Sequence, residues 1–256
     1  LDNELSKKRS HIDFLNPEKC YFPLTNMRCK EFEVFIKEGD QVKVGQVIGQ
    51  RKAAFFEQNI HSTISGKYVG NEKHLHRTGD LTEFIVIEND FKDEVVETAT
   101  DLSYDEIGKL GKEKVLELVK NNSNIGLGGS GFPTYIKLAT PHSIDTVLVN
   151  GAECEPYLTS DVDTMFAEAD KMIYGLHFMI EYYGAKKGVI GIKNKHKELI
   201  SFLNERIEAL GLPNITLKPV GNYYPAGWEK DLITSITGIE VPAGKMPAEY
   251  GVMVFN

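Results

Sequence analysis

The chain has 256 residues, of which 41% are hydrophobic and 26% are charged, a composition that supports a folded protein and excludes disorder and fibrous repeats. Its 37 acidic and 29 basic side chains give a formal net charge of -8, so nucleic acid is not an expected partner. No window approaches the roughly 18 apolar residues of a membrane-spanning helix, and the three cysteines never form a C-x-x-C pair. We expect a cytoplasmic protein without membrane insertion, and without iron–sulfur or zinc ligation in this stretch.

The first part of the chain has a β-type pattern. Residues 1–25 are expected to form an irregular lead-in, because Asn16-Pro17 and Phe22-Pro23 interrupt regular structure. Residues 26–98 then show short apolar runs separated by glycine turns, which predicts a small all-β domain. Its strands are expected at Phe32–Ile36, Val42–Val44, Val47–Ile48, Thr63–Ile64, Lys67–Val69 and Phe84–Ile87.

Beyond an acidic linker at residues 88–98, the pattern changes to strands that alternate with helices. Ser103 and Glu106 form a capping box that predicts a helix over Tyr104–Lys120. Strands are then expected at 145–150, 187–192 and 215–220, with helices at 160–183, 196–210 and 228–236. This alternation predicts an α/β layered domain over residues 99–256 with a mainly parallel sheet. The final apolar run, at 251–256, is typical of a core strand, so we expect a fragment that is truncated within this domain.

The most informative segment is the glycine-rich stretch from Ile125 to Leu138. Its four glycines within six residues, followed by Pro133 and a helical pattern, let the backbone approach a ligand and direct N–H groups at an anion. The spacing matches neither the G-x-G-x-x-G fingerprint nor a P-loop. We expect a phosphate or a flavin edge here, and the alternative is a plain glycine-rich turn.

Two further segments each follow a predicted strand. The stretch 149–161 holds an amide and two acids, and the stretch 222–233 holds aromatic residues, a glycine and an acid. Ligands of open α/β sheets bind beyond the carboxyl ends of strands, so these turns are expected to converge on one crevice. The alternative is that Glu153 and Glu155 are solvated and that Ser160 only caps a helix. Cys154 is expected to pack rather than to act as a nucleophile.

Together these segments resemble the flavin- and NADH-binding C subunit of the Rnf electron transport complex and, more distantly, the flavin subunit of respiratory complex I. The resemblance covers about residues 100–256 and is carried by Gly126-Leu-Gly-Gly-Ser-Gly-Phe-Pro-Thr134, by Asn150-Gly-Ala-Glu-Cys-Glu-Pro-Tyr-Leu-Thr159, and by Tyr224-Pro225 with Glu229-Lys230. The β-rich start is similar to the barrel-sandwich hybrid domain of that protein, which implies a docking module.

The resemblance implies that FMN is the bound flavin and NADH the electron donor. FMN contacts carry over to Gly126, Gly128, Gly129, Lys137, Asn150, Glu153, Tyr224, Gly227 and Glu229. NADH contacts carry over to Phe132, which would stack on adenine, and to Glu155 and Glu229. NADH would transfer hydride to FMN, and the electrons would pass to 4Fe-4S clusters expected only in the missing C-terminal part. No side chain is expected to be a catalytic acid or base or a metal ligand.

The implied partners are other subunits of a membrane-associated redox complex, which would hold the protein at the inner face of the cell membrane.

One departure from the family pattern bears on this function. Family members usually read Tyr-Pro-Gln-Gly-Gly-Glu-Lys, whereas this chain has Ala226 and Trp228. An indole there could stack on the flavin or fill the nicotinamide space. The alternatives are therefore a redox adaptor that has lost NADH access, or an electron carrier for a soluble reductase such as D-proline reductase.

The β domain has two further interpretations. It resembles the lipoyl and biotinyl carrier fold, but Lys52 lacks the acidic or methionine neighbours of a modified lysine, so we expect an unmodified docking module. His74 and His76 share a strand face without a third ligand, which favours exposed strand polarity over a metal site.

Overall fold

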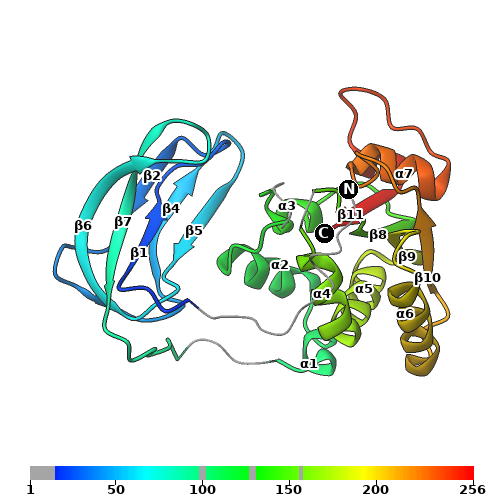
Figure 1. Ribbon diagram of the computed structural model, residues 1–256, viewed down its shortest axis with the longest axis horizontal. Coiled ribbons are helices and arrows are strands. Elements are labelled where there is room, and N and C mark those ends of the chain that lie inside the picture. The colour runs from blue at the N-terminus through cyan, green and yellow to red at the C-terminus, as the bar shows by residue number, and fades with distance from the viewer. Residues whose placement is uncertain (1–14, 98–101, 127–130, 156–157) are drawn as a thin grey trace. The chain divides into compact units, whose positions relative to one another are not determined.

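The predicted strands and helices fall into two units of the chain. The computed structural model describes residues 15–97, 102–126, 131–155 and 158–256 (Figure 1). One compact unit extends to Ile125 and also includes Gly131–Leu138, and the other is formed mainly by Ala139–Asn256. The first unit therefore continues past the boundary near residue 98 at which the sequence pattern changes.

The first unit contains two antiparallel sheets around one apolar core, which confirms the predicted all-β domain. One sheet has the order β1-β7-β6-β3 and the other β2-β4-β5. The strands are β1 (Lys19–Pro23), β2 (Glu31–Val34), β3 (Gln41–Val42), β4 (Val47–Lys52), β5 (Glu57–His61), β6 (Gly66–Leu75) and β7 (Leu81–Asn89). Both sheets bury side chains in this core, among them Ile48, Ile60, Ile85 and Ile87.

Two expectations for the β domain are wrong. The lead-in at 1–25 is not irregular throughout, since β1 pairs with β7 from Lys19 to Pro23. The proline is tolerated because β1 is an edge strand and ends there. The strand expected at Thr63–Ile64 is a bend, and the strand β5 precedes it. The polar composition of β5 conceals it, because its inward-facing residues are Gln58 and Ile60.

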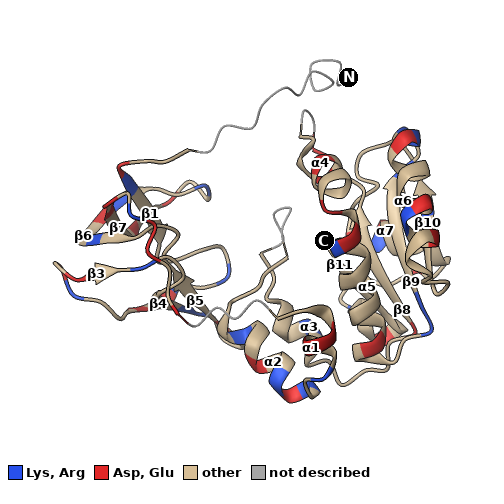
Figure 2. Cartoon of the chain, turned by 90° about the horizontal axis from the view of Figure 1, so that it is seen from below, with Lys and Arg blue, Asp and Glu red and all other residues tan. Residues whose placement is uncertain are grey.

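Three helices follow the strands within the first unit. The capping box of Ser103 and Glu106 is confirmed, but the expected single helix is interrupted between α1 (Tyr104–Gly108) and α2 (Lys112–Asn121). The cause is local, since the glycine that caps α2 has an extended backbone and glycines weaken helices. The helix α2 buries one residue and carries both charge signs along its length (Figure 2). The helix α3 (Thr134–Leu138) follows the glycine-rich stretch.

The second unit is a four-stranded parallel sheet with the order β10-β9-β8-β11. Its strands are β8 (Thr146–Gly151), β9 (Lys187–Lys193), β10 (Ile215–Val220) and β11 (Val252–Phe255), and each lies where the sequence predicts a strand. The helices are α4 (Ser160–Ala167), α5 (Ala169–Tyr183), α6 (Lys197–Leu210) and α7 (Glu229–Thr237), and a 3-10 turn spans Pro247–Tyr250. The expected helix over 160–183 is divided at Glu168, whose φ of -124° breaks it.

Helices cover both faces of this sheet (Figure 1). Side chains of α4, α5 and α6 pack on one face with Val147, Ile190 and Ile192. Side chains of α7 pack on the other face with Leu148 and Val189. None of the helices in the described ranges has the length and apolar character needed to cross a membrane.

Gly66, the first residue of β6, offers a test of the β domain. Its φ is +157°, and a Cβ atom there would lie 1.9 Å from the carbonyl oxygen of Glu88. We expect Gly66→Ala to lower the free energy of unfolding by at least about 1–3 kcal/mol, because both strain and a backbone clash oppose it. The control is Gly175→Ala, at a helical position with open space, which should be neutral or add up to about 1 kcal/mol. Equal urea midpoints for Gly66→Ala and the wild type would contradict this packing.

Candidate functional site at the carboxyl edge of the parallel sheet

The strand order places a switch point between β8 and β11. From β8 the chain adds β9 and then β10 on one side, and it returns through α7 to place β11 on the other side of β8. Open α/β sheets bind ligands at the carboxyl edge where the strand order reverses. Asn150 lies at the end of β8 and Asn256 directly after β11, and Asn150 Nδ2 donates to Asn256 Oδ1 over 3.2 Å.

Gly227 joins the loop after β10 to the loop after β8. Its carbonyl oxygen accepts a hydrogen bond from Asn150 Nδ2 at 2.9 Å, and its N–H donates to Cys154 Sγ at 2.9 Å. A Cβ atom at Gly227 would lie 2.3 Å from the carbonyl oxygen of Ala152, so the contact requires glycine. The two predicted segments therefore converge, and Cys154 ties the loops together.

Aromatic side chains flank the start of α7. Tyr224 and Trp228 are 64% and 60% exposed, and their rings meet edge to face with centroids 6.1 Å apart. Trp228 is the N-cap residue of α7 and supplies no side-chain cap, so its side chain leaves the first N–H groups of the helix to other partners. Glu229 lies in the first turn. This end of α7 thus combines flat apolar surface with N–H groups that favour an anion.

Two carboxyl groups lie together beyond β8. Burial, followed by the negative charge of Glu153 and a hydrogen bond with it, raises the pKa of Asp161 above its usual value. Glu153 Oε1 also accepts the backbone N–H of Glu155 at 3.0 Å. The pair can therefore retain a proton more readily than two solvated acids.

The second half of the glycine-rich stretch is anchored on the β domain. Gln58 Nε2 donates to the carbonyl oxygen of Gly131 at 3.5 Å, and Tyr135 Oη accepts the backbone N–H of Glu57 at 3.2 Å. The ring of Phe132 lies 6.4 Å from that of Phe56.

A basic side chain completes this aromatic cluster. The guanidinium carbon of Arg28 lies 5.6 Å above the centroid of the Phe132 ring, within the range of a cation–π contact. Phe132 therefore has a defined setting on the β domain. Arg28 and Phe56 were missed by sequence reasoning, because nothing in the sequence links them to a segment so distant along the chain.

The structure assembles some of the predicted residues and not others. The structure brings six of them to the carboxyl edge of the sheet: Asn150 near the end of β8, Glu153 and Glu155 after it, Tyr224 and Gly227 after β10, and Glu229 at the start of α7. Phe132 and Lys137 belong to the first unit, Gly126 groups with the second, and Gly128 and Gly129 lie outside the described residues. Sequence reasoning also missed Asn256, which accepts a hydrogen bond from Asn150, and Asp161, which lies beside Glu153.

The remaining candidate features have local partners. Lys52 pairs with Glu33 at 3.2 Å, and His74 pairs with Glu72 at 2.8 Å. Within the described residues, no group of three or more His, Cys, Asp or Glu side chains is placed to hold a metal ion.

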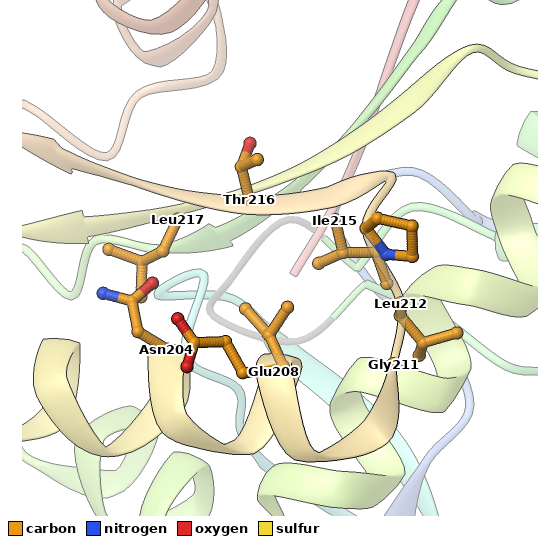
Figure 3. Close-up of a pocket in the computed structure, with 9 residues that line it drawn as sticks. Asn204, Glu208, Gly211, Leu212, Ile215, Thr216 and Leu217 are labelled. Atoms are coloured by element: carbon orange, nitrogen blue, oxygen red, sulfur yellow. The ribbon is translucent and has the colours of Figure 1, made fainter.

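A cavity of about 660 Å³ lies between α6 and β10 (Figure 3). Its lining includes Glu208 and Gly211 from the end of the helix and Ile215 from the start of the strand. The amino ends of parallel strands lie opposite their carboxyl ends, so this cavity is not part of the candidate site.

Comparison with known proteins agrees with this architecture. Residues 119–256 match the family model of the Nuo51 FMN-binding domain, and residues 2–92 match that of the RnfC barrel sandwich hybrid domain. These matches confirm the predicted fold class, a barrel-sandwich hybrid followed by a parallel α/β domain. The NAD+-reducing [NiFe]-hydrogenase in its H2-reduced state shares the fold over 57% of this chain and 29% of its own, with a TM-score of 0.50 and 21% identity.

Curated relatives are similar along nearly all of the chain. The C subunit of the Na(+)-translocating ferredoxin:NAD(+) oxidoreductase complex of Acetobacterium woodii is 35% identical, over 94% of this chain and 54% of its own. Its proton-translocating counterpart from Clostridium ljungdahlii is 34% identical, over 94% and 52%. The C subunit of the ion-translocating oxidoreductase complex of Vibrio cholerae is 31% identical, over 98% and 32%. The chain thus spans about half of the first two relatives and a third of the last.

The carboxyl pair makes the stability of this region dependent on pH. Because the pKa of Asp161 is raised in the folded protein, the folded state binds this proton more tightly than the unfolded state does. The free energy of unfolding therefore falls as pH rises from the unfolded pKa of about 3.9 through the raised folded value. We expect Asp161→Asn to raise the urea midpoint at about pH 7, and the gain to vanish below about pH 4. Asp105→Asn, at an exposed carboxylate, is the control and should give no gain. A loss of stability for Asp161→Asn at neutral pH would contradict the assignment.

Proposed function

Since the chain belongs to the family of Rnf C subunits, with an FMN-binding domain of the Nuo51 type, we propose that it is the electron-entry flavoprotein of a redox complex. The loops that follow β8 and β10 would hold FMN, which would supply the acceptance of a hydride, two electrons with one proton, from NADH and the release of single electrons to iron–sulfur centres of the complex. The partners are other subunits of the complex, which hold the protein at the inner face of the cell membrane.

One observation carries this proposal: two loops meet at Gly227 beside the switch point of the sheet, next to the uncapped start of α7. The residues present fit a flavin nucleotide. The N–H groups at the start of α7 suit an anionic oxygen, and the exposed rings of Tyr224 and Trp228 suit a planar ring system. Asn150 carries an amide at the same edge, which suits the polar rim of that ring system.

FMN, when bound, supplies the redox chemistry, and the side chains bind and orient it. Asn150 holds Gly227 and Asn256 in place, so the loops present a preorganised edge to the cofactor. Glu153 is oriented by the backbone N–H of Glu155 and would contact the ribityl or ring side of FMN. No side chain is required as an acid or base.

We assign the adenine of NADH to Phe132. The cation–π contact with Arg28 and the packing on Phe56 hold the phenyl ring in one orientation, and a held ring loses little entropy when a base stacks on it. Glu155 and Glu229 would contact the ribose and nicotinamide portions.

A second candidate function follows from Trp228, where the family pattern has glycine. Its large exposed side chain at the start of α7 would exclude nicotinamide if it covered the flavin. The protein would then be a redox adaptor that keeps the fold and binds partner proteins without oxidising NADH.

Flavin binding is the first test. Titration of the purified protein with FMN should quench flavin fluorescence at one site per chain, and NADH added without oxygen should bleach the flavin absorbance. Asn150→Ala removes the hydrogen bonds to Gly227 and Asn256, and at roughly 0.5–1.5 kcal/mol per bond the affinity for FMN should fall about tenfold. Asn204→Ala, beside the distant cavity, is the matched control and should bind as the wild type does. No flavin binding by the wild type would overturn the proposal.

Trp228→Gly separates the two candidate functions. If the electron-entry function is correct, the wild type reduces its flavin with NADH, and the variant does so at a similar or faster rate. If the protein is an adaptor, only the variant does so, because loss of the indole opens the nicotinamide space. Stopped-flow measurement of flavin bleaching distinguishes these outcomes, and Tyr250→Phe, at a ring remote in sequence from the loops, serves as the control.

A further inference from the structure

Arg28 is an exposed cation held over an aromatic ring of the β domain. Its guanidinium carbon lies 5.6 Å from the centroid of the Phe132 ring, and Phe132 is only half-buried, so part of its ring stays accessible. A cation–π contact uses the charge of a guanidinium and leaves its five N–H donors, which lie in one plane, for other partners. This place therefore offers a flat apolar surface together with donors that match an anionic oxygen.

The loop that carries Arg28 is joined to the ring by a buried amide. Asn26 Oδ1 accepts the backbone N–H of Arg28 at 2.9 Å, and Asn26 Nδ2 donates to Gln58 Oε1 at 3.1 Å. Gln58, which is only 4% exposed, also donates through Nε2 to the carbonyl oxygen of Gly131 at 3.5 Å, directly before Phe132. One amide thus positions both the arginine loop and the ring, so the fold sets their separation.

The surroundings of Arg28 are positive although the chain as a whole is acidic. Burial raises the pKa of the Cys29 thiol, and the charges of Arg51 and Arg28 act against that rise, so both guanidinium groups lie near this thiol. Arg51 is held in place by a hydrogen bond of 2.9 Å from its Nε to the carbonyl oxygen of Pro23. Two cations near one buried group make this part of the β domain attractive to an anion.

The acid that follows Phe56 points away from this surface. Phe56 is buried, whereas Glu57 is half-buried and pairs with Lys120 at 2.8 Å. Successive side chains of an extended chain point to opposite faces, so Glu57 is directed away from Phe56, and its charge is balanced. The apolar surface is instead extended by Phe55, which is 65% exposed and lies edge to face with Phe56 at 4.9 Å. An aromatic surface beside a cation suits a base that carries phosphate.

We propose that Arg28 is a nucleotide-binding residue that pairs with a phosphate group of the nucleotide whose adenine stacks on Phe132. The inference rests on the proposed function, which assigns adenine to Phe132. The phosphates of an adenosine nucleotide are attached to the ribose next to the base, so a guanidinium beside the stacking ring lies on their side and donates to two phosphate oxygens at once. Two positions carry such a phosphate: the 5′ diphosphate, which NADH and NADPH share, and the 2′ phosphate, which distinguishes NADPH.

The experiment titrates the whole chain with adenosine, ADP and adenosine 2′-monophosphate and measures each Kd by ligand-observed NMR. We expect at least one of the phosphates to bind more tightly than adenosine. Arg28→Met should weaken that ligand by about tenfold or more, because charge-assisted hydrogen bonds are lost, and should leave adenosine binding unchanged. Weaker binding of ADP assigns Arg28 to the 5′ diphosphate, and weaker binding of the 2′-monophosphate assigns it to the group that marks NADPH.

The matched control is Lys30→Met, which removes an exposed cation two residues away in the same loop and should alter none of these affinities. Arg28→Lys keeps the charge and loses the planar pair of donors, so it should recover part of the affinity. Phe132→Leu removes the stacking ring and should weaken all three ligands by a similar factor. Because Arg28 is exposed, Arg28→Met should unfold at a temperature close to that of the wild type.

The proposal is overturned if Arg28→Met weakens adenosine and the phosphates equally, since Arg28 would then only position the ring of Phe132. It is also overturned if the wild type binds neither phosphate more tightly than adenosine, or if Phe132→Leu leaves the binding of all three ligands unchanged. These titrations contain no flavin, whereas the proposed function is tested by FMN binding and its bleaching with NADH, so the two failures are distinguishable.

Discussion

The candidate site depends on the close approach of Gly227 to the backbone of Ala152. No side chain fits between the carbonyl oxygen of Ala152 and the α-carbon of Gly227. At this separation both polar groups of Gly227 find partners: its carbonyl oxygen accepts from Asn150 near the end of β8, and its N–H donates to Cys154 in the loop that follows. The loop after β10 leads directly into α7, so these bonds also fix where that helix begins.

The order of the strands explains why these loops can meet. Because β11 lies beside β8 and not beside β10, the segment from β10 to β11 crosses back over one face of the sheet as α7. The crossing is close, since the helix lies directly over Gly191, where any side chain would displace Leu232 and Ile236. Gly151 serves the opposite face in the same way, with Met165 of α4 against it. Small residues on neighbouring strands thus let helices cover both faces near the carboxyl edge.

Most of the second unit could be predicted from the sequence, because buried parallel strands are continuous apolar runs with turn residues at their ends. The four strands lie where they are predicted, whereas the helices over 104–120 and 160–183 are interrupted. Periodicity alone cannot reveal the break at Glu168, since α4 and α5 both present apolar faces to the same core. The strand β5 was missed because it buries Gln58, whose amide is satisfied by partners remote in sequence, Asn26 and Gly131.

Some residues of the candidate site can be recognised from their own sequence segments, and others only from contacts between distant parts of the chain. Asn150 and Gly227 could be identified from their own segments, and the cofactor contacts assigned to them stay predictions. Arg28 could not, because its relation to Phe132 arises only when β5 anchors the end of the glycine-rich stretch. That anchoring also changes the interpretation of the β domain, which supports a segment predicted to bind the cofactor; its role as a docking module stays a prediction.

The distribution of charge shows why net charge is a poor guide to this site. A chain with a formal charge of -8 repels polyanions as a whole, but a buried group responds to the charges beside it far more than to distant, screened ones. At the carboxyl edge the local charges are separated: the N–H groups at the start of α7 carry partial positive charge, whereas the acids Glu153 and Asp161 follow β8. An anionic group would be favoured beside the start of α7 and disfavoured beside the two acids. The polarity of the edge, more than its total charge, therefore sets the orientation in which an anionic ligand can bind.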